Sequence, residues 1–496
     1  MALRLSAKRV TAALKAGNVS PVINGYIQRN ASQAMAYATN VRAESKHIIE
    51  AFHDVPSEAN ISHPDPSPNS QTAHLIGEQA PYMVATYVRP PPMFVKGAGC
   101  HLWDVENRKY LDFTAGIAVN ALGHCDPEIA KIMLEQGTTL MHTSNLYHNP
   151  WTGALSKLLI EKTLESNSMH DAQAVFICNS GSEANEAAIK FARKTGKVVD
   201  PSGDKHEVVS FQNSFHGRTM GSLSATPNPK YQKPFSPMLP GFKYGTYNDV
   251  DAIKDLVTEK TCGVIVEPIQ GEGGVIVATE EFLTALAARC REVGAVLIYD
   301  EIQCGLSRTG TFWAHASLPK SAHPDIITTA KALGNGFPIG ATIVNKNVTE
   351  KIKVGDHGTT FGGNPLGSRI AHYIVSRLSD ASLQKDVLKK SEIFKKHFQA
   401  LQSKYPELVK EIRGKGLHLG LQLSQDPTPI VTAARERGLL IITAGTNTLR
   451  FVPSLNITEQ EIEEGFSILA EAMRIVTSPV EEPQGAQVHG EVDSPN

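Results

Sequence analysis

The stretch PDIITTAKALGNGFPIGATIV, residues 324–344, places two short apolar runs on either side of a lysine and a glycine-rich turn. Short apolar runs bounded by glycine and proline are typical of buried strands in a parallel sheet. Lys331 follows the first run, so we expect it at the carboxyl edge of the sheet, where open α/β folds bind their ligands. Taken alone, a solvated lysine in a loop is the simpler interpretation, so the rest of the chain must decide.

The same alternation of apolar runs and amphipathic segments continues through the middle of the chain. Segments such as EEFLTALAARCREVG, residues 280–294, have helical length and periodicity. This pattern predicts an α/β fold with a mostly parallel central sheet that helices cover on both faces. From about residue 367, longer helical segments precede shorter strands, which predicts a smaller α+β domain. The runs expected to form the sheet are AVFIC (174–178), EVVSF (207–211), CGVIVEP (262–268), AVLIYDE (295–301), PDIITTA (324–330) and IGATIV (339–344).

Composition restricts the class of ligand. The chain has 496 residues, of which 41% are hydrophobic and 20% charged, as in an ordinary soluble globular protein. A formal net charge of -2 argues against a nucleic acid or an anionic membrane as a partner bound by bulk electrostatics. The six cysteines form no C-x-x-C pair and no His/Cys metal spacing, so neither a metal nor a disulfide framework is predicted. Small molecules are therefore the expected ligands.

The two ends of the chain differ in composition from its middle. Residues 1–45 are rich in basic residues, alanine and serine and have no acid before Glu44, which predicts a mitochondrial transit peptide and a location in the matrix. A basic tail without a targeting function is the alternative. Residues 46–80, rich in proline and small polar side chains, are predicted to be a disordered linker. The acidic residues 477–496 are predicted to be disordered as well.

A phosphate site is one interpretation of CNSGSEANEAAIKFAR, residues 178–193, which leads from a predicted strand into a helix. The free N–H groups of a helix start bind phosphate well, and Gly181 with Ser182 would allow close approach. A serine N-cap with Glu183 in the first turn explains the stretch equally well. The chain has neither a Walker loop nor a G-x-G-x-x-G fingerprint, which disfavours a nucleotide-binding oxidoreductase.

Other polar residues follow further strands. Asp300 comes directly after the apolar LIY of LIYDEIQCG, and a buried carboxylate needs a partner, although helix capping is the alternative. In SFHGRT, Phe215 offers a flat face for stacking and Arg218 a fork for a carboxylate. A core aromatic beside a surface arginine is the alternative there. VEPIQGEGG adds Glu267 and Glu272 after another strand.

One cofactor would account for these clusters together. Pyridoxal phosphate requires a phosphate cradle, an anion beside its ring nitrogen, an aromatic side chain against its ring and a lysine that binds it covalently. Each part is weak alone, but their combination favours this cofactor.

Six motifs, in chain order, resemble the class III (ornithine-type) pyridoxal-phosphate aminotransferases over residues 81–476. They are NSGSEANEAAIKFAR, FHGRT, VEPIQGEGGV, YDEIQCGLSRTG, AKALGNGFPIG and TTFGGNPLG. GIAVNALGHCDP and LRFVPSLNIT are most similar to the acetylornithine branch of that family. The resemblance implies a PLP-dependent transferase of fold type I that works as a homodimer with shared active sites. It also implies an N-terminal segment packing with the small domain (81–135), a large cofactor-binding domain (136–366) and a C-terminal small domain (367–476).

The resemblance also assigns roles to individual residues. Those implied to be catalytic are Lys331, which binds the cofactor covalently, and Asp300, the partner of the ring nitrogen. The further residues implied to hold the cofactor are Gly181 and Ser182 at the phosphate, Phe215 on the ring, Gln303 near the ring hydroxyl and Thr360, which reaches the phosphate from the other subunit. The residues implied to contact substrate are Arg218, Thr359, Arg450 and Glu272, the last as the partner of Arg450.

The implied reaction moves the terminal amino group of N2-acetyl-L-ornithine to 2-oxoglutarate, giving N-acetylglutamate 5-semialdehyde and L-glutamate in arginine biosynthesis. Two alternatives stay open inside the family: ornithine and 4-aminobutyrate aminotransferase, whose central motifs are similar. A non-catalytic scaffold that keeps the fold is a third, which the presence of Lys331, Asp300 and Phe215 disfavours.

Overall fold

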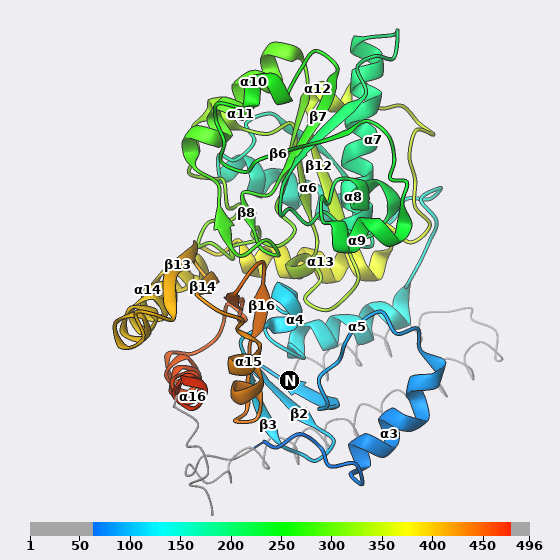
Figure 1. The fold of residues 1–496 in the computed structure, drawn as a ribbon. Helices are drawn as coiled ribbons and strands as arrows, with labels where there is room; N and C mark the ends of the chain where they lie inside the picture. Colours follow the sequence, from blue (N-terminus) through cyan, green and yellow to red (C-terminus); the bar gives the residue numbers. More distant parts are fainter. Residues whose placement is uncertain (1–62, 478–496) are drawn as a thin grey trace, which may run out of the picture. The chain divides into compact units, whose positions relative to one another are not determined.

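A seven-stranded sheet forms the centre of the upper half of Figure 1, in the computed structural model, which describes residues 63–477. Its order is β4-β12-β11-β10-β7-β5-β6, and only β12 runs against its neighbours. The mostly parallel α/β sheet predicted from the sequence is therefore confirmed. Its strands are β4 (Ala172–Cys178), β5 (Glu207–Phe211), β6 (Phe242–Gly245), β7 (Thr261–Val266), β10 (Val296–Asp300), β11 (Ile326–Thr329) and β12 (Gly340–Asn345).

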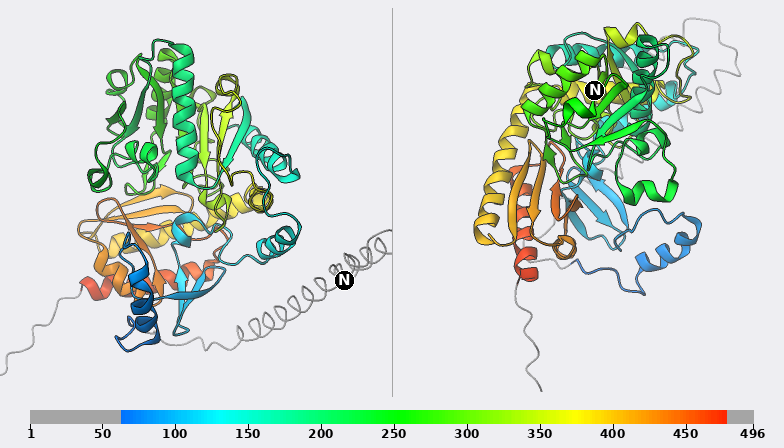
Figure 2. Two further views of the ribbon diagram at one scale, coloured as in Figure 1. Left: turned by 90° about the vertical axis from the view of Figure 1, so that its right-hand side faces the viewer. Right: turned by 45° about the horizontal axis from the view of Figure 1, so that its top comes forward.

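Alternate side chains of the central strands cover the two faces of this sheet. Val264 and Leu297 pack with α11 (Glu280–Val293) on one face, whereas Ile265 and Ile298 pack with α7 (Gly181–Val199) on the other. Fully burying one such aliphatic side chain stabilises the fold by about 1.5–3 kcal/mol. The left view of Figure 2 shows α7 running along the sheet, so its first turn is fixed beside the strand ends.

Two smaller sheets lie below the central sheet in Figure 1, and one of them joins the two ends of the described chain. In it, β15 (Leu439–Leu440) pairs in parallel with β3 (Lys109–Asp112). The other strands of these sheets are β1 (Phe94–Ala98), β2 (His101–Asp104), β13 (Val409–Lys415), β14 (His418–Leu423), β16 (Ile442–Ala444) and β17 (Thr448–Phe451). A short hairpin pairs β8 (Ile269–Gln270) with β9 (Ile276–Val277).

Helices complete the layers around the sheets. The longer ones are α3 (Gln71–Gln79), α5 (Pro127–Thr139), α6 (Pro150–Glu165), α13 (Pro365–Leu378), α14 (Ala381–Lys404), α15 (Thr428–Arg435) and α16 (Glu459–Thr477). The short ones are α4 (Ala115–Ala118), α8 (Met220–Ser224), α9 (Pro229–Gln232), α10 (Ile253–Leu256) and α12 (Lys346–Thr349), with 3₁₀ turns at Ala80–Tyr82, Lys233–Phe235, Lys320–Ala322 and Lys331–Leu333. Within residues 63–477, no helix has both the length and the apolar character that crossing a membrane requires.

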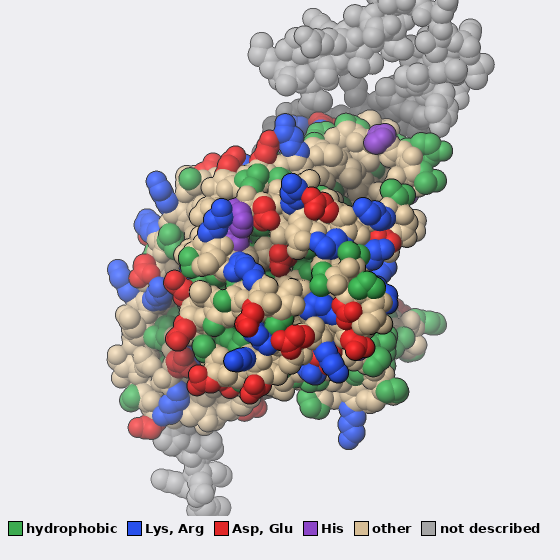
Figure 3. Space-filling view, turned by 90° about the horizontal axis from the view of Figure 1, so that it is seen from above, with side chains coloured by type: hydrophobic (Ala, Val, Ile, Leu, Met, Phe, Trp, Pro, Cys, Tyr) green, Lys and Arg blue, Asp and Glu red, His purple; other side chains and the backbone are tan. Residues whose placement is uncertain are grey.

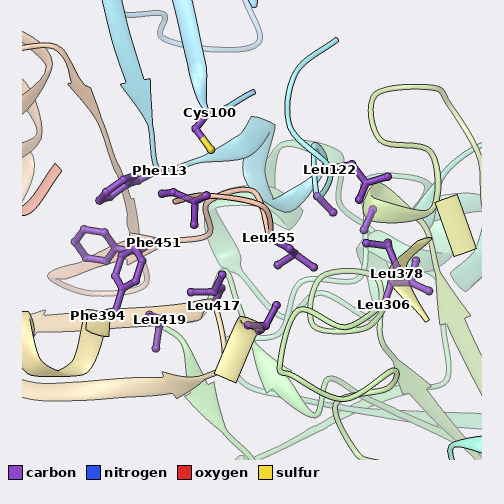
Figure 4. Close-up of a cluster of buried hydrophobic side chains, with 14 of the residues drawn as sticks. Cys100, Phe113, Leu122, Leu306, Leu378, Phe394, Leu417, Leu419, Phe451 and Leu455 are labelled. Atoms are coloured by element: carbon purple, nitrogen blue, oxygen red, sulfur yellow. The ribbon is translucent and has the colours of Figure 1, made fainter. Parts of the chain in front are cut away.

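A single large hydrophobic core connects the smaller sheets with one face of the central sheet. Phe113, Phe394 and Phe451 meet in its aromatic part, where the Phe113 and Phe394 rings lie 5.4 Å apart (Figure 4). The same core includes Ile327 of β11 and Ile343 of β12. The domain boundaries at 135/136 and 366/367 therefore cross a continuous core, and they stay predictions.

The prediction of a disordered linker over residues 46–80 needs correction for its described part. Residues 71–79 form α3, which Ser70 caps by accepting from the N–H of Ala73, and Thr72 Oγ1 donates to Glu106. Asp65 pairs with Arg435 at 2.8 Å. Proline content alone missed these contacts because the segment gains its order from the folded body and not from a core of its own. The predicted transit peptide, residues 46–62 and residues 478–496 lie outside the described residues.

The surface agrees with a nearly neutral chain. On the face seen in Figure 3, acidic and basic side chains are interspersed and do not gather into one large patch of a single sign. This distribution fits a protein whose ligand is recognised in a cavity, where a few placed charges act at short range.

Candidate active site

Five parallel strands end at one cavity of about 320 Å³. The residues that follow β4, β5, β7, β10 and β11 line it, because the carboxyl ends of parallel strands share one edge of the sheet. β12 begins at the same edge, so the turn before it also lines the cavity. The polar residues that line it at or after the strand ends are Asn179, Ser180, Ser182, His216, Glu267, Asp300, Gln303 and Lys331.

Lys331 is the second residue after the end of β11 and lies half-buried in the wall of the cavity. Its backbone has φ +43°, in the left-handed region that non-glycine residues rarely adopt and that recurs at functional sites. Burial, followed by the positive charge of Arg450, lowers the pKa of Lys331 to about 8, while nearby carboxylates act in the opposite direction. A large fraction of this amine is therefore neutral at mildly alkaline pH.

Asp300 ends β10 as a buried carboxylate. Such a group needs hydrogen-bond donors, and the fold supplies them from two side chains and one backbone N–H. Nδ1 of His216 and Nδ2 of Asn185 each donate to its Oδ2 over 2.8 Å, and the N–H of Ile302 donates to Oδ1 over 3.1 Å. Three donors fix the orientation of the carboxylate. Sequence reasoning gave no role to His216 or Asn185, although His216 directly follows Phe215 and Asn185 lies one turn after Gly181.

The start of α7 forms a cradle with the Phe215 loop. Gly181 and Ser182 are the first residues of the helix, so their N–H groups have no acceptor within it. Ser182 Oγ accepts from the N–H of Arg218 over 3.2 Å. Gly217 has φ +134°, and a Cβ there would lie 2.3 Å from Ser182 Oγ, so only glycine allows this close approach.

Phe215 is held at the cavity by a buried acid. Its N–H donates to Glu267 Oε2 over 3.1 Å, and both residues line the cavity. Burial, with the nearby charge of Asp300, raises the pKa of Glu267 well above its ordinary value. This shift in pKa favours the protonated form of Glu267.

Arg450 and Glu272 form an ion pair beside the cavity. Nη2 of Arg450 lies 3.1 Å from Glu272 Oε2, and Nη1 donates to Gln303 Oε1 over 3.3 Å. Arg450, on β17, is 2% exposed, whereas the side chain of Glu272 is 35% exposed and has room to move. The two predicted partners are thus brought together, and Gln303 joins them to the cavity wall.

Arg218 lies at the exposed mouth of the site and stacks on an aromatic ring that sequence reasoning missed. Its guanidinium carbon is 3.7 Å from the ring centroid of Tyr231, on α9, and 5.5 Å from that of Phe215. The only signal for Tyr231 in the sequence is an aromatic between two lysines, which predicts nothing about its position.

The two threonines of TTFGG do not line the cavity of their own chain. Thr359 Oγ1 accepts from Asn179 Nδ2 over 3.0 Å, and the side chain of Thr360 is exposed. Among the residues that the structure describes, no group of three or more His, Cys, Asp or Glu side chains could hold a metal ion.

These residues fit pyridoxal phosphate. The start of α7 could hold the phosphate, Phe215 could cover one face of the ring, Asp300 could receive the ring N–H, and Lys331 could bind the aldehyde carbon. A Cβ at Gly181 would lie 2.9 Å from Ile302, so the cradle exists because the side chain is absent. Fold and site together define a pyridoxal-phosphate-dependent enzyme of fold type I.

The chain belongs to the class III aminotransferases, since the family model "Aminotransferase class-III" matches residues 83–473. It is 72% identical to the mitochondrial acetylornithine aminotransferase of Neurospora crassa, over 84% of this chain and 91% of that protein. It is 56% identical to the enzyme of that name from Yarrowia lipolytica, over 82% of this chain and 97% of that one. The predicted pyridoxal-phosphate aminotransferase is confirmed, and the protein is mitochondrial, as its basic N-terminal residues predicted.

Solved structures agree with this assignment. The ornithine aminotransferase of Toxoplasma gondii superposes with a TM-score of 0.76 at 30% identity, covering 82% of this chain and 96% of that one. The N-acetylornithine aminotransferase of Stenotrophomonas maltophilia superposes with a TM-score of 0.68 at 34% identity, covering 81% of this chain and 99% of that one. Fold alone therefore does not separate the two activities.

Proposed function

We propose that the protein transfers the terminal amino group of N2-acetyl-L-ornithine to 2-oxoglutarate, forming N-acetylglutamate 5-semialdehyde and L-glutamate. The observation that carries this proposal is the Arg450–Glu272 ion pair at 3.1 Å. It neutralises one of two arginines beside the cavity, which leaves Arg218 as the cation for the single carboxylate of the donor. The names of the most similar relatives support the same substrate.

Lys331 and Asp300 would carry the chemistry in this proposal. When bound, pyridoxal phosphate supplies an aldehyde that links to amines and a ring that accepts electrons from the substrate carbon. The amine of Lys331, with its pKa lowered to about 8, would act as the base that takes the proton from that carbon. Asp300, oriented by His216 and Asn185, keeps the ring nitrogen protonated. Gly181, Ser182, Phe215 and Gln303 position the cofactor.

The second substrate brings two carboxylates to the same site. In our proposal Arg218 binds the distal carboxylate of 2-oxoglutarate, as it binds the carboxylate of N-acetylornithine, with Thr359 close to the same substrate position. The carboxylate beside the reacting carbon then displaces Glu272 from Arg450. The exposure of Glu272 supports this exchange, because a half-exposed carboxylate can return to water at little cost.

A panel of donors with 2-oxoglutarate as acceptor tests the proposed substrate. The kcat/KM is expected to be highest with N-acetylornithine and lower with ornithine and 4-aminobutyrate. Each half-reaction can be followed in the absorption spectrum of the cofactor. A preference for ornithine or 4-aminobutyrate would assign the chain to that activity. Absence of any visible-region absorbance from a lysine-linked cofactor would favour a non-catalytic protein.

We also propose that the protein works as a homodimer in which Thr360 binds the cofactor phosphate in the active site of the other subunit. Thr360 is exposed, as are Leu146, Val354 and Phe361 at 85%, 108% and 62%, and Asn145 Nδ2 donates to the carbonyl of Thr359. Co-expressed Lys331→Ala and Thr360→Ala chains test it. A mixed dimer has one site with both residues, so its activity should exceed that of either variant alone. Activity no higher than that of Thr360→Ala would argue for Thr360 acting in its own chain or not at all.

A further inference from the structure

Tyr231 touches three functional side chains at once. The guanidinium carbon of Arg218 lies 3.7 Å from its ring centroid, and its hydroxyl donates to Glu272 Oε1 over 3.4 Å. Its ring also meets that of Phe215 edge to face, with 6.2 Å between centroids. Tyr231 is therefore the aromatic bridge between the exposed arginine and the acid that pairs with the buried arginine.

Local structure fixes the ring in this place. Asn228 caps α9 by accepting from the N–H of Lys230, and Gln232 anchors the last residue of the helix by donating to Leu223 O and to the hydroxyl of Tyr244. Tyr231 lies between these two anchors, so its ring is positioned before any substrate binds. A preorganised ring can hold a cation without the loss of side-chain entropy that a mobile one would suffer.

The ring and the hydroxyl have separate effects. A flat aromatic face beneath a guanidinium limits the directions in which Arg218 can point, while leaving its N–H groups free for a carboxylate. The hydroxyl holds the second oxygen of Glu272 while Arg450 holds the first. Burial and the carboxylate of Glu272 raise the pKa of Tyr231, so the hydroxyl keeps its proton and acts as a donor.

We propose that Tyr231 is a specificity-determining residue: its ring orients Arg218 for the donor carboxylate, and its hydroxyl retains Glu272 on Arg450. This inference rests on the proposed function. Retention of Glu272 makes Arg450 harder to reach for any donor that carries a carboxylate beside its reacting amine. The site thereby favours a donor that reacts through a remote terminal amine and has no such carboxylate.

Two substitutions separate the two effects. Tyr231→Phe removes only the hydroxyl, and the ratio of kcat/KM for N-acetylornithine to that for ornithine reacting at its α-amine should fall about two- to tenfold, with KM for N-acetylornithine unchanged. Tyr231→Leu also removes the ring, and KM should rise roughly three- to thirtyfold for both N-acetylornithine and 2-oxoglutarate, because each uses Arg218. Tyr405→Phe is a matched control: it also has a lysine over its ring, 5.3 Å away, and its hydroxyl has no partner among the described residues.

A double-mutant cycle with Glu272→Gln decides whether the hydroxyl acts through Glu272. In the Glu272→Gln background, Tyr231→Phe should change the donor ratio no further. Additive effects, or an unchanged ratio in the single Tyr231→Phe variant, would overturn the inference, as would unchanged KM values in Tyr231→Leu. Failure of the proposed function is a different result: the unmodified enzyme would then itself prefer ornithine to N-acetylornithine, whatever the outcome of the cycle.

Discussion

His216 donates from Nδ1 to Oδ2 of Asp300 over 2.8 Å, and both side chains are buried. The contact fixes the tautomer of the imidazole, because a carboxylate can only accept. It also explains how the chain keeps an anion at the end of a buried strand, where an unpartnered charge would be costly.

Replacing Asp300 by Asn removes the charge while keeping the size of the side chain. We expect kcat to fall by roughly 10²–10³, as when a preorganised electrostatic partner is removed, because the ring nitrogen loses the anion that keeps it protonated. Single-turnover rates of each half-reaction measure the effect. A kcat within a few-fold of the unmodified enzyme would show that Asp300 has only a structural role.

Replacing His216 by Phe keeps a ring in the same space but removes the donor. The loss of a hydrogen bond to a charged group predicts a decrease in kcat of about tenfold, well below the effect of Asp300→Asn. The other imidazole nitrogen, Nε2, is buried without a hydrogen-bond partner among residues 63–477, so its removal leaves nothing newly unpaired. An effect as large as that of Asp300→Asn would mean that His216 acts on the cofactor directly.

Part of this site could be predicted from the sequence because strand ends are visible in it. Lys331 and Asp300 each follow an apolar run, and parallel strands bring such positions to one edge. Asn185, His216 and Tyr231 could not be predicted, because their roles depend on contacts between segments that only the fold brings together. The antiparallel direction of β12 could not be predicted either, because the apolar pattern of a strand does not indicate which way it runs in the sheet. The turn from Lys331 to Ile339 brings the chain back so that β12 pairs antiparallel with β11.

Glu267 and α3 also depend on contacts with distant segments of the chain. Glu267 was visible as an acid after a strand, but its burial and its bond to the N–H of Phe215 were not. For α3, composition described the segment correctly as poor in apolar residues. It could not show that Asp65 and Thr72 find partners on the folded body.

Glu267→Gln should stabilise the holoenzyme at neutral pH. Burial raises the folded-state pKa of Glu267 above its unfolded value, so the unmodified protein loses stability as pH rises from the unfolded pKa toward the folded one. Glutamine removes that loss of stability, which amounts to about 1.4 kcal/mol for each pH unit between the unfolded and the folded pKa of Glu267. Melting temperatures from pH 5 to 8 should show a gap between variant and parent that closes as the pH falls. A gap that widens toward low pH would mean that Glu267 is ionised in the folded state.

The lowered pKa of Lys331 predicts how the cofactor-free protein takes up pyridoxal phosphate. Covalent capture needs a neutral amine, so the rate should rise with pH up to about 8, where the pKa of Lys331 lies, and then level off. For a lysine in water, the rate of capture would continue to rise up to about pH 10. Because the charge of Arg450 is the second cause of the shift after burial, Arg450→Met should move the midpoint upward. A midpoint near 10 in the unmodified protein would contradict the placement of Lys331 in the cavity wall near the charge of Arg450.

Glu272→Gln should change which donors the enzyme accepts. Glutamine fits the same space but no longer neutralises Arg450, which lies 3.1 Å from the carboxylate, so the buried cation becomes available to a carboxylate beside the reacting amine. We expect kcat/KM for α-amino donors such as ornithine to rise relative to N-acetylornithine by roughly tenfold, which corresponds to about 1.4 kcal/mol. The exposed Glu407→Gln, which loses a surface contact to Lys410, is the matched control and should leave the ratio unchanged. An unaltered donor preference in Glu272→Gln would exclude the exchange of partners at Arg450 as the basis of dual substrate recognition.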